Sequence, residues 1–555
     1  MASEPAHSDT PPLWSSSHGQ WLVLALALLV YLAAVRPFYG LTADDAFISF
    51  RYAQSWAAGC GPVYSCGETP VEGYTNFLWM ALAALSIAVG ADVVQVMRLL
   101  GLLCGFAALA AALLLCRRLH RRPAAQLVVV AGMAASPFWA ANAVTGLETA
   151  AATLSVLVAA TLSLDLPGRK RAWAAGVAWG VSYLLRPEAA GFAALTGLWS
   201  LGAGLLGRLG LRQTLRGTLL YGVGFLAVAA PYFTWRVLYY GDLFPNTFHA
   251  KQDDLWLLIS RNLALLGSHW LHFAPVLVIA LAVLVLQRRA RLLYLVLLAL
   301  GSALISLSVH NNFWMPGHRL YLTAVTLLLV VAAGVVELDG SRWEGKPAWR
   351  RAGLVALALA CAPLVLAGWA YFPATQELAQ LHYATDDNPA RKMGLHIRRL
   401  ARPGDWLAIR DAGMVPFFAG PGVKVLDMHE KSLNDRHITW SGWKVGYVMG
   451  RKPRFIVFAS PFERTLPVSS PICQAQGIPV SRLLGGKDES HCVVFAHLQG
   501  WLLARSAQFR DGRYRQAMKV PWHRLRYFML FQRDQHHSSG KPSPKQSTKT
   551  PGKRH

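Results

Sequence analysis

Two adjacent carboxylates, Asp44 and Asp45, follow the first apolar segment in the run Leu-Thr-Ala-Asp-Asp-Ala-Phe-Ile-Ser-Phe-Arg-Tyr. Acidic side chains are costly near a bilayer, so a pair directly outside a membrane span needs a local reason. One reason is structural, because either Asp could cap a helix that begins at about residue 46. A cap needs only one Asp. The second therefore favours a carboxylate that does chemistry, such as a general base.

The composition is that of an integral membrane protein. Hydrophobic residues make up 54% of the 555 residues and charged residues only 15%, with a mean hydropathy of +0.33; a soluble protein would carry more charge. Residues 1–20 lack Lys and Arg and no cleavage site follows them, which predicts a retained first span. We expect eleven membrane helices, each near the ~20 residues that a bilayer requires. Their approximate bounds are 20–37, 93–116, 124–141, 147–164, 172–186, 188–206, 217–238, 270–287, 292–309, 319–337 and 351–372.

The charge pattern predicts the orientation of these spans. The apolar stretch 74–90 is short, and we interpret it as an interfacial or re-entrant helix; the basic clusters then all fall on one side. Short loops rich in Lys and Arg stay cytoplasmic, so we expect a cytoplasmic N-terminal segment, 1–19, and an outer C-terminal part. The clusters lie at 117–122, 169–171, 208–216, 288–291 and 342–351.

The formal net charge of +25 has two sources, these loops and the segment 373–555. A basic outer domain suits anionic lipid headgroups or acidic glycans. A nucleic-acid partner is not expected, because this segment faces away from the cytoplasm. Two local cysteine pairs, Cys60 with Cys66 and Cys473 with Cys492, fall in outer segments and could form disulfides in an oxidising compartment.

The first outer loop, 38–92, gathers polar residues behind the aspartates. Residues 45–57 have the pattern of an amphipathic helix lying along the membrane. Arg51 lies two turns from Asp44, roughly 10 Å along a helix, and is therefore free to bind something else. The candidate substrate contacts of this loop are Arg51, Glu68, Glu72, Tyr74 and Asn76.

Two later outer loops, 239–251 and 310–319, mix cations, amides and aromatic rings. One interpretation is an aromatic belt with snorkelling cations. The other is a phosphate site, with Arg319 as a fork donor, Lys251 as a point charge and His249 or His318 as further donors. Aromatic faces could stack on a sugar. The remaining candidate substrate contacts of these loops are Tyr240, Asn246 and Trp314.

Two further acids lie near the outer ends of spans. Glu148 could cap the helix that it begins or orient a substrate hydroxyl. Glu188, in Arg186-Pro-Glu, fits a plain ion pair with Arg186 at a proline-broken turn.

The sequence pattern of the chain changes after residue 372. Short β-type runs at 406–410, 423–426, 455–458 and 492–495 alternate with helical stretches such as 389–401. We therefore expect a membrane domain, 20–372, followed by a small extracytoplasmic α/β domain, 373–533. Residues 534–555 are polar and basic and should be disordered.

The sequence resembles GT-C type membrane glycosyltransferases, and within them the bacterial terminal arabinofuranosyltransferase family that uses polyprenyl-phosphate arabinofuranose. In place of the family's Gly-Gly-Asp before Trp-Met-Pro, this chain has Asn311-Asn312-Phe313, which puts an acidic role there, and the sugar, in doubt. The motifs that carry the resemblance are Asp44-Asp-Ala-Phe-Ile-Ser-Phe-Arg-Tyr, Val71-Glu-Gly-Tyr-Thr-Asn-Phe-Leu-Trp, Gly146-Leu-Glu, Arg186-Pro-Glu, Tyr240-Gly-Asp-Leu-Phe-Pro-Asn-Thr-Phe-His-Ala-Lys, Trp314-Met-Pro-Gly-His-Arg, Asp411-Ala-Gly-Met-Val-Pro-Phe-Phe and Leu433-Asn-Asp-Arg-His-Ile.

The resemblance implies an α-helical polytopic GT-C bundle with its active site at the outer surface and essential first-loop aspartates. The reaction would move a single sugar, arabinofuranose by resemblance, from a polyprenyl phosphate to a glycan, glycolipid or protein acceptor outside the bacterial cytoplasmic membrane. A carboxylate base and positioned cations would supply what this reaction needs. We assign Asp44 as the base and Asp45 as the orienting group, an order that could be reversed. Some GT-C enzymes use a divalent cation, for which Glu68 and Glu72 are candidate ligands.

Two other functions fit part of the pattern. A lipid-linked glycan flippase would place ionisable residues in mid-membrane and show repeated halves, which this sequence lacks. A ligase that moves a whole glycan from a polyprenyl pyrophosphate also needs outer cations, but paired aspartates after the first span fit the monophosphate type better. The sequence leaves inversion or retention at the anomeric carbon open.

Overall fold

The computed structural model describes most of the chain, and the two compact units into which it divides differ from the predicted domains. Residues up to Gly404, together with Asp411–Trp443, form the first unit, and Asp405–Arg410 and Lys444 onwards form the second. The segment 411–443 therefore belongs with the membrane helices. The described residues are 17–166, 169–206, 210–250, 255–308, 319–338, 347–379, 388–429, 432–460, 466–467, 478–479, 491–493, 503–504, 506–507, 509, 514–523 and 526–533.

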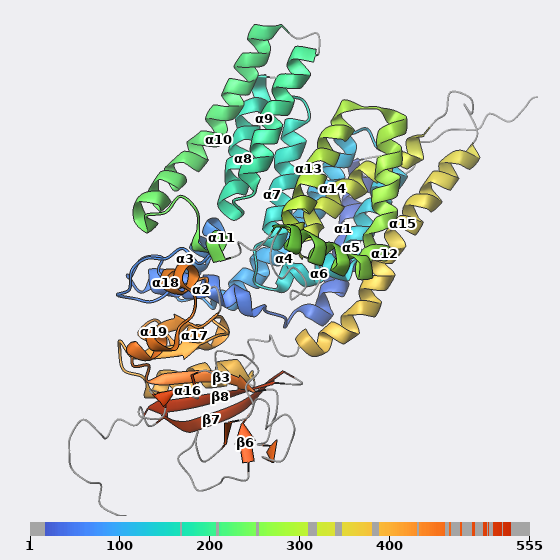
Figure 1. The fold of residues 1–555 in the computed structure, drawn as a ribbon. Helices are drawn as coiled ribbons and strands as arrows, with labels where there is room; N and C mark the ends of the chain where they lie inside the picture. The colour runs from blue at the N-terminus through green and yellow to red at the C-terminus, as the bar shows by residue number, and fades with distance from the viewer. Residues whose placement is uncertain are drawn as a thin grey trace, which may run out of the picture. The chain divides into compact units, whose positions relative to one another are not determined.

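The first unit is a bundle with a helix at each of the eleven predicted spans (Figure 1). Seven described helices are long and apolar enough to cross a membrane, or eight if a pair bent by 54° at Ser136-Pro137 counts as one; proline ends a helix in this way. This is a multi-pass membrane protein. The bundle helices are α1 (Ser17–Val35), α4 (Val93–Arg118), α5 (Pro123–Ala135), α6 (Pro137–Val144), α7 (Thr149–Ser163), α8 (Arg169–Leu185), α9 (Ala189–Leu206), α10 (Leu211–Tyr240), α12 (Leu255–Gln287), α13 (Ala290–Leu307), α14 (Leu322–Ala332) and α15 (Pro347–Ala379).

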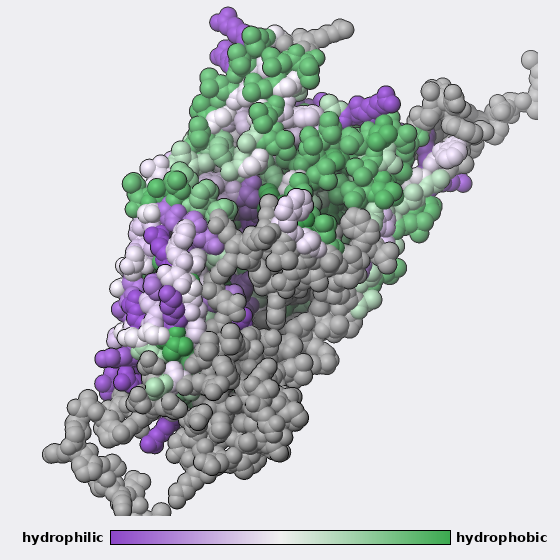
Figure 2. Space-filling model, viewed as in Figure 1, coloured by the Kyte–Doolittle hydropathy of each residue, from purple (hydrophilic) through white to green (hydrophobic). Residues whose placement is uncertain are grey.

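The outward faces of these helices are apolar. Along α10, Leu219, Leu226 and Leu238 are 67%, 56% and 80% exposed, which suits contact with lipid rather than water. Figure 2 shows hydrophobic residues covering the long helices on the face in view. Inside the bundle, small residues let neighbouring helices approach. A Cβ on Gly176 of α8 would lie 2.0 Å from the carbonyl oxygen of Tyr221 on α10, the close helix packing typical of membrane proteins.

Three of the basic clusters lie at one end of the bundle. Asp165 pairs with Arg118 at 3.6 Å, with Arg171 at 3.1 Å and with Arg291 at 2.9 Å, so the loops after α4, α7 and α12 meet there. The first outer loop lies at the other end of α4, since Arg98 near its start donates to Thr42 Oγ1 at 2.5 Å. The 26 residues of α4 are about 39 Å long. The cellular orientation stays a prediction.

Short elements cover the end of the bundle that carries the first outer loop. The predicted amphipathic segment forms α2 (Asp44–Ala57), and the predicted interfacial stretch forms α3 (Phe77–Ala88), a helix of 12 residues. Phe47 and Phe50 of α2 are fully buried, packed on Phe417 at ring-centroid distances of 5.3 and 6.3 Å. The other elements at this end are η2 (Arg36–Phe38), α11 (Asn246–Ala250), η3 (Arg319–Tyr321), α16 (Pro389–Leu400), α17 (Met414–Ala419), β2 (Lys424–Asp427) and α18 (Arg436–Ser441). At the opposite end, η4 (Ala333–Glu337) follows α14, and its Glu337 pairs with Arg121 at 2.6 Å.

The second unit is a small α/β module, as the sequence predicts. In its main sheet, β1 pairs in parallel with β3, β3 pairs antiparallel with β8, and β8 pairs antiparallel with β7. Short strands β4 (Leu466–Pro467) and β5 (Ile478–Pro479) flank β6 (His491–Val493). The main elements of the unit are β1 (Trp406–Ile409), α19 (Val445–Gly450), β3 (Phe455–Ser460), β7 (Tyr514–His523) and β8 (Arg526–Arg533).

Candidate active site

A cavity of about 870 Å³ opens inside the first unit, next to the first outer loop. Its wall is built from α2, the loop before α3, the start of α7, the turn between α8 and α9, the segment 244–248, the end of α13, η3 and Leu433. Segments far apart in the sequence therefore meet at one hollow. Its charged lining residues are Asp45, Glu148, Arg186, Glu188 and Arg319.

The two aspartates have different environments. Asp44 does not cap its own helix; its Oδ1 accepts from the backbone N–H of Met414 at 2.8 Å, at the start of α17. The contact is possible because residue 413 is Gly, where a Cβ would lie 2.3 Å from Asp44 Oδ2. Burial raises the pKa of Asp44 to about 7; the Met414 N–H opposes this shift, and the charges of Asp411 and Asp45 add to it.

Asp45 is the aspartate that faces the cavity. Its side chain is exposed, and it lines the hollow together with Ser49 on the next turn of α2. Within the described part of the chain it makes no hydrogen bond or ion pair. An open carboxylate at a cavity wall can take a proton from a substrate, whereas one bound to a backbone N–H holds a neighbouring segment. The geometry therefore separates the two aspartates: Asp45 opens to the cavity, and Asp44 holds the start of α17.

Glu148 is held at the centre of a buried polar network. Arg186 donates from Nη1 to Glu148 at 2.6 Å and from Nε to Glu188 at 2.6 Å. Asn76 Nδ2 donates to the other Glu148 oxygen at 2.8 Å, and Ser49 Oγ donates to Asn76 at 3.0 Å. The ion pair suggested for Glu188 is present, but it includes Glu148, and all these residues line the cavity. Arg186, expected only as the ion-pair partner of Glu188, is thus a wall residue.

Arg319 brings a second positive charge to the same cavity. Among the described residues its buried Nη1 has no hydrogen-bond partner, and Arg319 forms no ion pair. A buried guanidinium donor without a partner is costly, so the position suits an anionic ligand. The other predicted phosphate donors in this region, Lys251 and His318, and the predicted sugar contact Trp314 lie outside the described residues.

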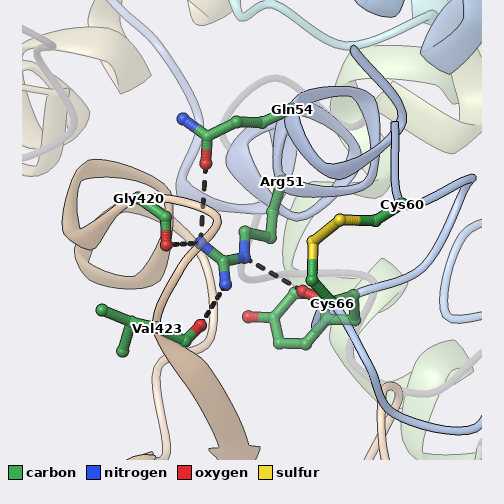
Figure 3. The surroundings of a disulfide bond; sticks show 7 residues. Arg51, Gln54, Cys60, Cys66, Gly420 and Val423 are labelled. Carbon is green, nitrogen blue, oxygen red and sulfur yellow. Dashed lines mark hydrogen bonds between the residues drawn. A yellow bond between two sulfur atoms is a disulfide. The ribbon is translucent and has the colours of Figure 1, made fainter. Parts of the chain in front are cut away.

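Arg51 has a structural environment. It is fully buried, it does not line the cavity, and its guanidinium group lies beside the disulfide loop (Figure 3). Nε donates to the Tyr64 carbonyl at 3.0 Å, and Nη1 and Nη2 donate to the carbonyls of Gly420 and Val423, both at 2.5 Å. Instead of binding substrate, as the sequence suggested, Arg51 joins the first outer loop to the segment 411–443.

The sequence left a disulfide between Cys60 and Cys66 open, and the structure contains it. It closes a loop whose members also hold the 411–443 segment, since Ser65 Oγ accepts from Val425 N at 2.9 Å. Cys473 of the second predicted pair lies outside the described residues.

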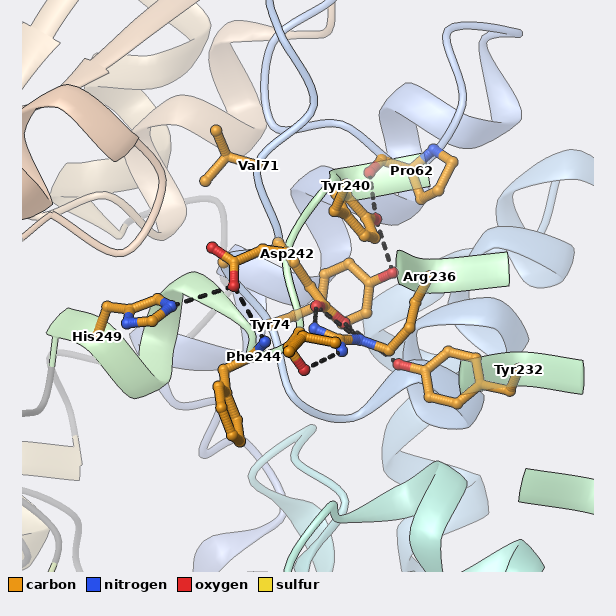
Figure 4. Close-up of polar contacts among 12 residues, drawn as sticks. Pro62, Val71, Tyr74, Tyr232, Arg236, Tyr240, Asp242, Phe244 and His249 are labelled. Carbon is orange, nitrogen blue, oxygen red and sulfur yellow. Dashed lines mark hydrogen bonds and ion pairs between the residues drawn. The ribbon is translucent and has the colours of Figure 1, made fainter. Parts of the chain in front are cut away.

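The two glutamates suggested as metal ligands are paired with cations and do not line the cavity. Glu72 accepts from Arg236 Nε at 3.0 Å and from the Tyr232 hydroxyl at 3.2 Å (Figure 4). Glu68 pairs with Lys424 at 2.6 Å. Among the described residues no group of three His, Cys, Asp or Glu could hold a metal ion.

The remaining candidates divide between the cavity wall and its support. Tyr74 lines the cavity and its hydroxyl lies 2.9 Å from that of Tyr240, which is buried behind it. Asn246 Nδ2 donates to the Leu433 carbonyl at 2.8 Å and so fixes that wall residue. His249 does not line the cavity, and its Nε2 lies 3.3 Å from Oδ1 of Asp242.

Two wall residues carry a signal that the sequence could not show. The hydroxyl groups of Thr149 and Thr247 are buried without a hydrogen-bond partner, and both residues line the cavity. Only the folded arrangement distinguishes them from other threonines near helix starts.

No protein-family model matches the sequence, and no curated protein matches it. Several solved structures, however, are similar to the fold of this chain. The chain is similar to ArnT from Cupriavidus metallidurans bound to undecaprenyl phosphate, with a TM-score of 0.54 at 14% identity over 87% of this chain and 99% of that one. The apo state of ArnT gives a TM-score of 0.53 at 13% identity over 88% and 99% of the two chains. The Archaeoglobus fulgidus oligosaccharyltransferase follows with a TM-score of 0.49 at 13% identity over 80% of this chain and 69% of that one. The likeness to the two ArnT structures confirms the predicted GT-C fold.

Proposed function

We propose that this GT-C-fold protein is a glycosyltransferase that transfers one sugar from a polyprenyl-phosphate donor to an acceptor hydroxyl. One observation carries the proposal. An open carboxylate, Asp45, and a buried, unpartnered guanidinium nitrogen, that of Arg319, line the same cavity of a membrane protein. Group transfer from a phosphate-linked sugar needs both, a base for the acceptor and a cation for the departing phosphate.

The chemical step follows from these two groups. Asp45 takes the proton of the acceptor hydroxyl as its oxygen attacks the anomeric carbon. The bond from that carbon to the phosphate oxygen breaks, and its electron pair leaves on the phosphate, which Arg319 stabilises by charge and hydrogen bonds. The products are the glycoside, polyprenyl phosphate and a protonated Asp45. Displacement by a single base predicts inversion at the anomeric carbon.

The charges of the cavity favour a monophosphate donor over a pyrophosphate one. Arg186 is already shared by Glu148 and Glu188 at 2.6 Å each. Among the described wall residues this leaves Arg319 as the cation without an ion pair, which matches the single negative charge of a sugar phosphodiester. The ligand printed for the ArnT neighbour, undecaprenyl phosphate, supports the lipid class of the donor.

Several finer parts of the proposal rest on the sequence. We propose arabinofuranose as the first sugar to test, a site at the outer face of the cytoplasmic membrane, and Lys251 and His318 as additional phosphate donors.

The test is sugar transfer by the purified protein in detergent from synthetic polyprenyl-phosphate arabinofuranose, then from mannose, glucose and aminoarabinose donors, to a mixed envelope extract. We expect Asp45→Asn to abolish transfer with donor binding intact, Asp44→Asn to keep measurable transfer, and Arg319→Ala to weaken polyprenyl-phosphate binding more than Arg319→Lys. Equal transfer by wild type and Asp45→Asn would refute Asp45 as the base. Lipid translocation by the wild type without transfer from any donor would favour the flippase alternative.

A further inference from the structure

An aromatic pair forms part of the cavity wall on the segment 244–248, which leads from the end of α10 into α11. The rings of Phe244 and Phe248 stack with centroids 4.7 Å apart and an interplanar angle of 23°. Both residues line the cavity, yet they are 50% and 46% exposed. The pair therefore presents ring surface both to the cavity and to the outside of the first unit. The proposed chemical step uses neither ring.

A polar group without a partner lies within the same short segment. Thr247 is only 4% exposed and lines the cavity, and its Oγ1 has no hydrogen-bond partner among the residues that the structure describes. Leaving a buried hydroxyl unpaired is unfavourable, because the group has given up its hydrogen bonds to water. Such a group on a cavity wall is accounted for if a ligand supplies the missing hydrogen bond.

The segment is held firmly in place. Arg236 Nη1 donates to the Leu243 carbonyl at 2.7 Å, and the Asp242 carboxylate accepts from Phe244 N at 3.1 Å. The N–H of Asn246 donates to the Glu72 carbonyl at 2.9 Å. Figure 4 shows the Phe244 ring pointing away from Arg236, whose side chain anchors this segment. A wall fixed in advance loses little entropy when a ligand binds.

These features together select one chemical class of ligand. A polyprenyl-phosphate donor, whose phosphate is assigned to Arg319, would cover the rings with its chain but leave the Thr247 hydroxyl unpaired. A phosphate would pair with the hydroxyl but gain nothing from the rings. A saccharide has an apolar C–H face for the aromatic surface and hydroxyl groups for Thr247, the combination of apolar and few polar contacts typical of ligand sites.

Building on the proposed function, we infer that Phe244, Thr247 and Phe248 form the acceptor subsite and that the acceptor is a saccharide. Its ring lies over the aromatic pair and one of its hydroxyl groups bonds to Thr247 Oγ1. The half-exposed rings let the rest of the acceptor extend out of the cavity, so the subsite accepts the end of a longer glycan.

The first test measures binding alone and does not depend on transfer. Defined arabino- and manno-oligosaccharides are titrated against the purified full-length protein by saturation-transfer NMR. We expect binding by the wild type, and at least about tenfold weaker binding by Thr247→Val, Phe244→Ala and Phe248→Ala, the order of an aromatic contact or a buried hydrogen bond. Thr247→Ser keeps the hydroxyl and should bind as the wild type does. Trp173→Ala is the matched control, an exposed aromatic outside the cavity wall.

The second test uses the transfer assay. Thr247→Val, Phe244→Ala and Phe248→Ala should raise KM for the saccharide acceptor, while their polyprenyl-phosphate binding stays unchanged. A change in donor binding instead would assign the rings to the lipid and overturn the inference, as would a wild type that binds none of the oligosaccharides. Saccharide binding that Thr247→Val weakens, without transfer from any donor, would keep the subsite and refute the proposed reaction. Thr247→Val is nearly isosteric, so it remains informative if a Phe variant does not fold.

Discussion

Replacing Arg51 should destabilise the protein rather than remove a substrate contact. Its guanidinium group is fully buried and bonds to backbone carbonyls of two chain segments. An acceptor left buried and unpaired costs about 1–3 kcal/mol, and because such costs do not add fully we expect Arg51→Ala to lose on the order of 5 kcal/mol. The acceptors are Tyr64 and Pro416 at 3.0 Å and Gly420 and Val423 at 2.5 Å.

The assay follows both global and local structure. Thermal unfolding of the detergent-purified protein should occur at a lower temperature in Arg51→Ala, and limited proteolysis should cut within 411–427 faster than in the wild type. Arg51→Lys keeps the charge but not the planar fork, so its unfolding temperature should lie between the two. Normal unfolding and protection of 411–427 in Arg51→Ala, together with a specific loss of transfer, would refute this reasoning and return Arg51 to substrate binding.

Two further predictions concern the same segment. Burial raises the pKa of Asp44 from 3.8 to about 7 on folding. The free energy of unfolding should therefore fall as pH rises through this interval. Unfolding temperatures measured against pH should lose this slope in Asp44→Asn, and an unchanged slope would contradict the assignment. Reducing the Cys60–Cys66 disulfide should lower the free energy of unfolding by about 2 kcal/mol, the loop-closure entropy of so short a loop. A phosphine reductant should therefore lower the unfolding temperature of the wild type but not of the Cys60→Ser, Cys66→Ser double variant. Equal responses would exclude a stabilising role for the disulfide.

Local sequence was enough to predict much of the fold. The apolar runs locate a helix at every proposed span, because a membrane helix needs a length and composition that few other segments have. Cys60 and Cys66 form the disulfide that their spacing and shared loop suggested. The strands at 406–409 and 455–460 follow from β-branched and aromatic runs.

The different environments of neighbouring residues could not be predicted in this way. Asp44 and Asp45 are indistinguishable in sequence, and what separates them in the structure is the N–H of Met414, 370 positions away. The hydrogen-bond partners of Arg51 could not be predicted either, since two of its acceptors lie beyond residue 419. Thr247 is marked by a missing hydrogen bond, a property that exists only after the walls of the cavity have come together.

The path of the chain between the two units limits how this protein can be altered, in the laboratory or by evolution. The backbone passes from one unit to the other three times, after Gly404, after Arg410 and after Trp443. No single cut separates the units. A chain ending at Gly404 would lose the partner of Asp44 and one wall residue of the cavity, Leu433. The C-terminal region therefore cannot be exchanged as a cassette by one recombination event; a viable chimaera would have to keep 411–443 with the membrane helices and replace only the sequence on either side.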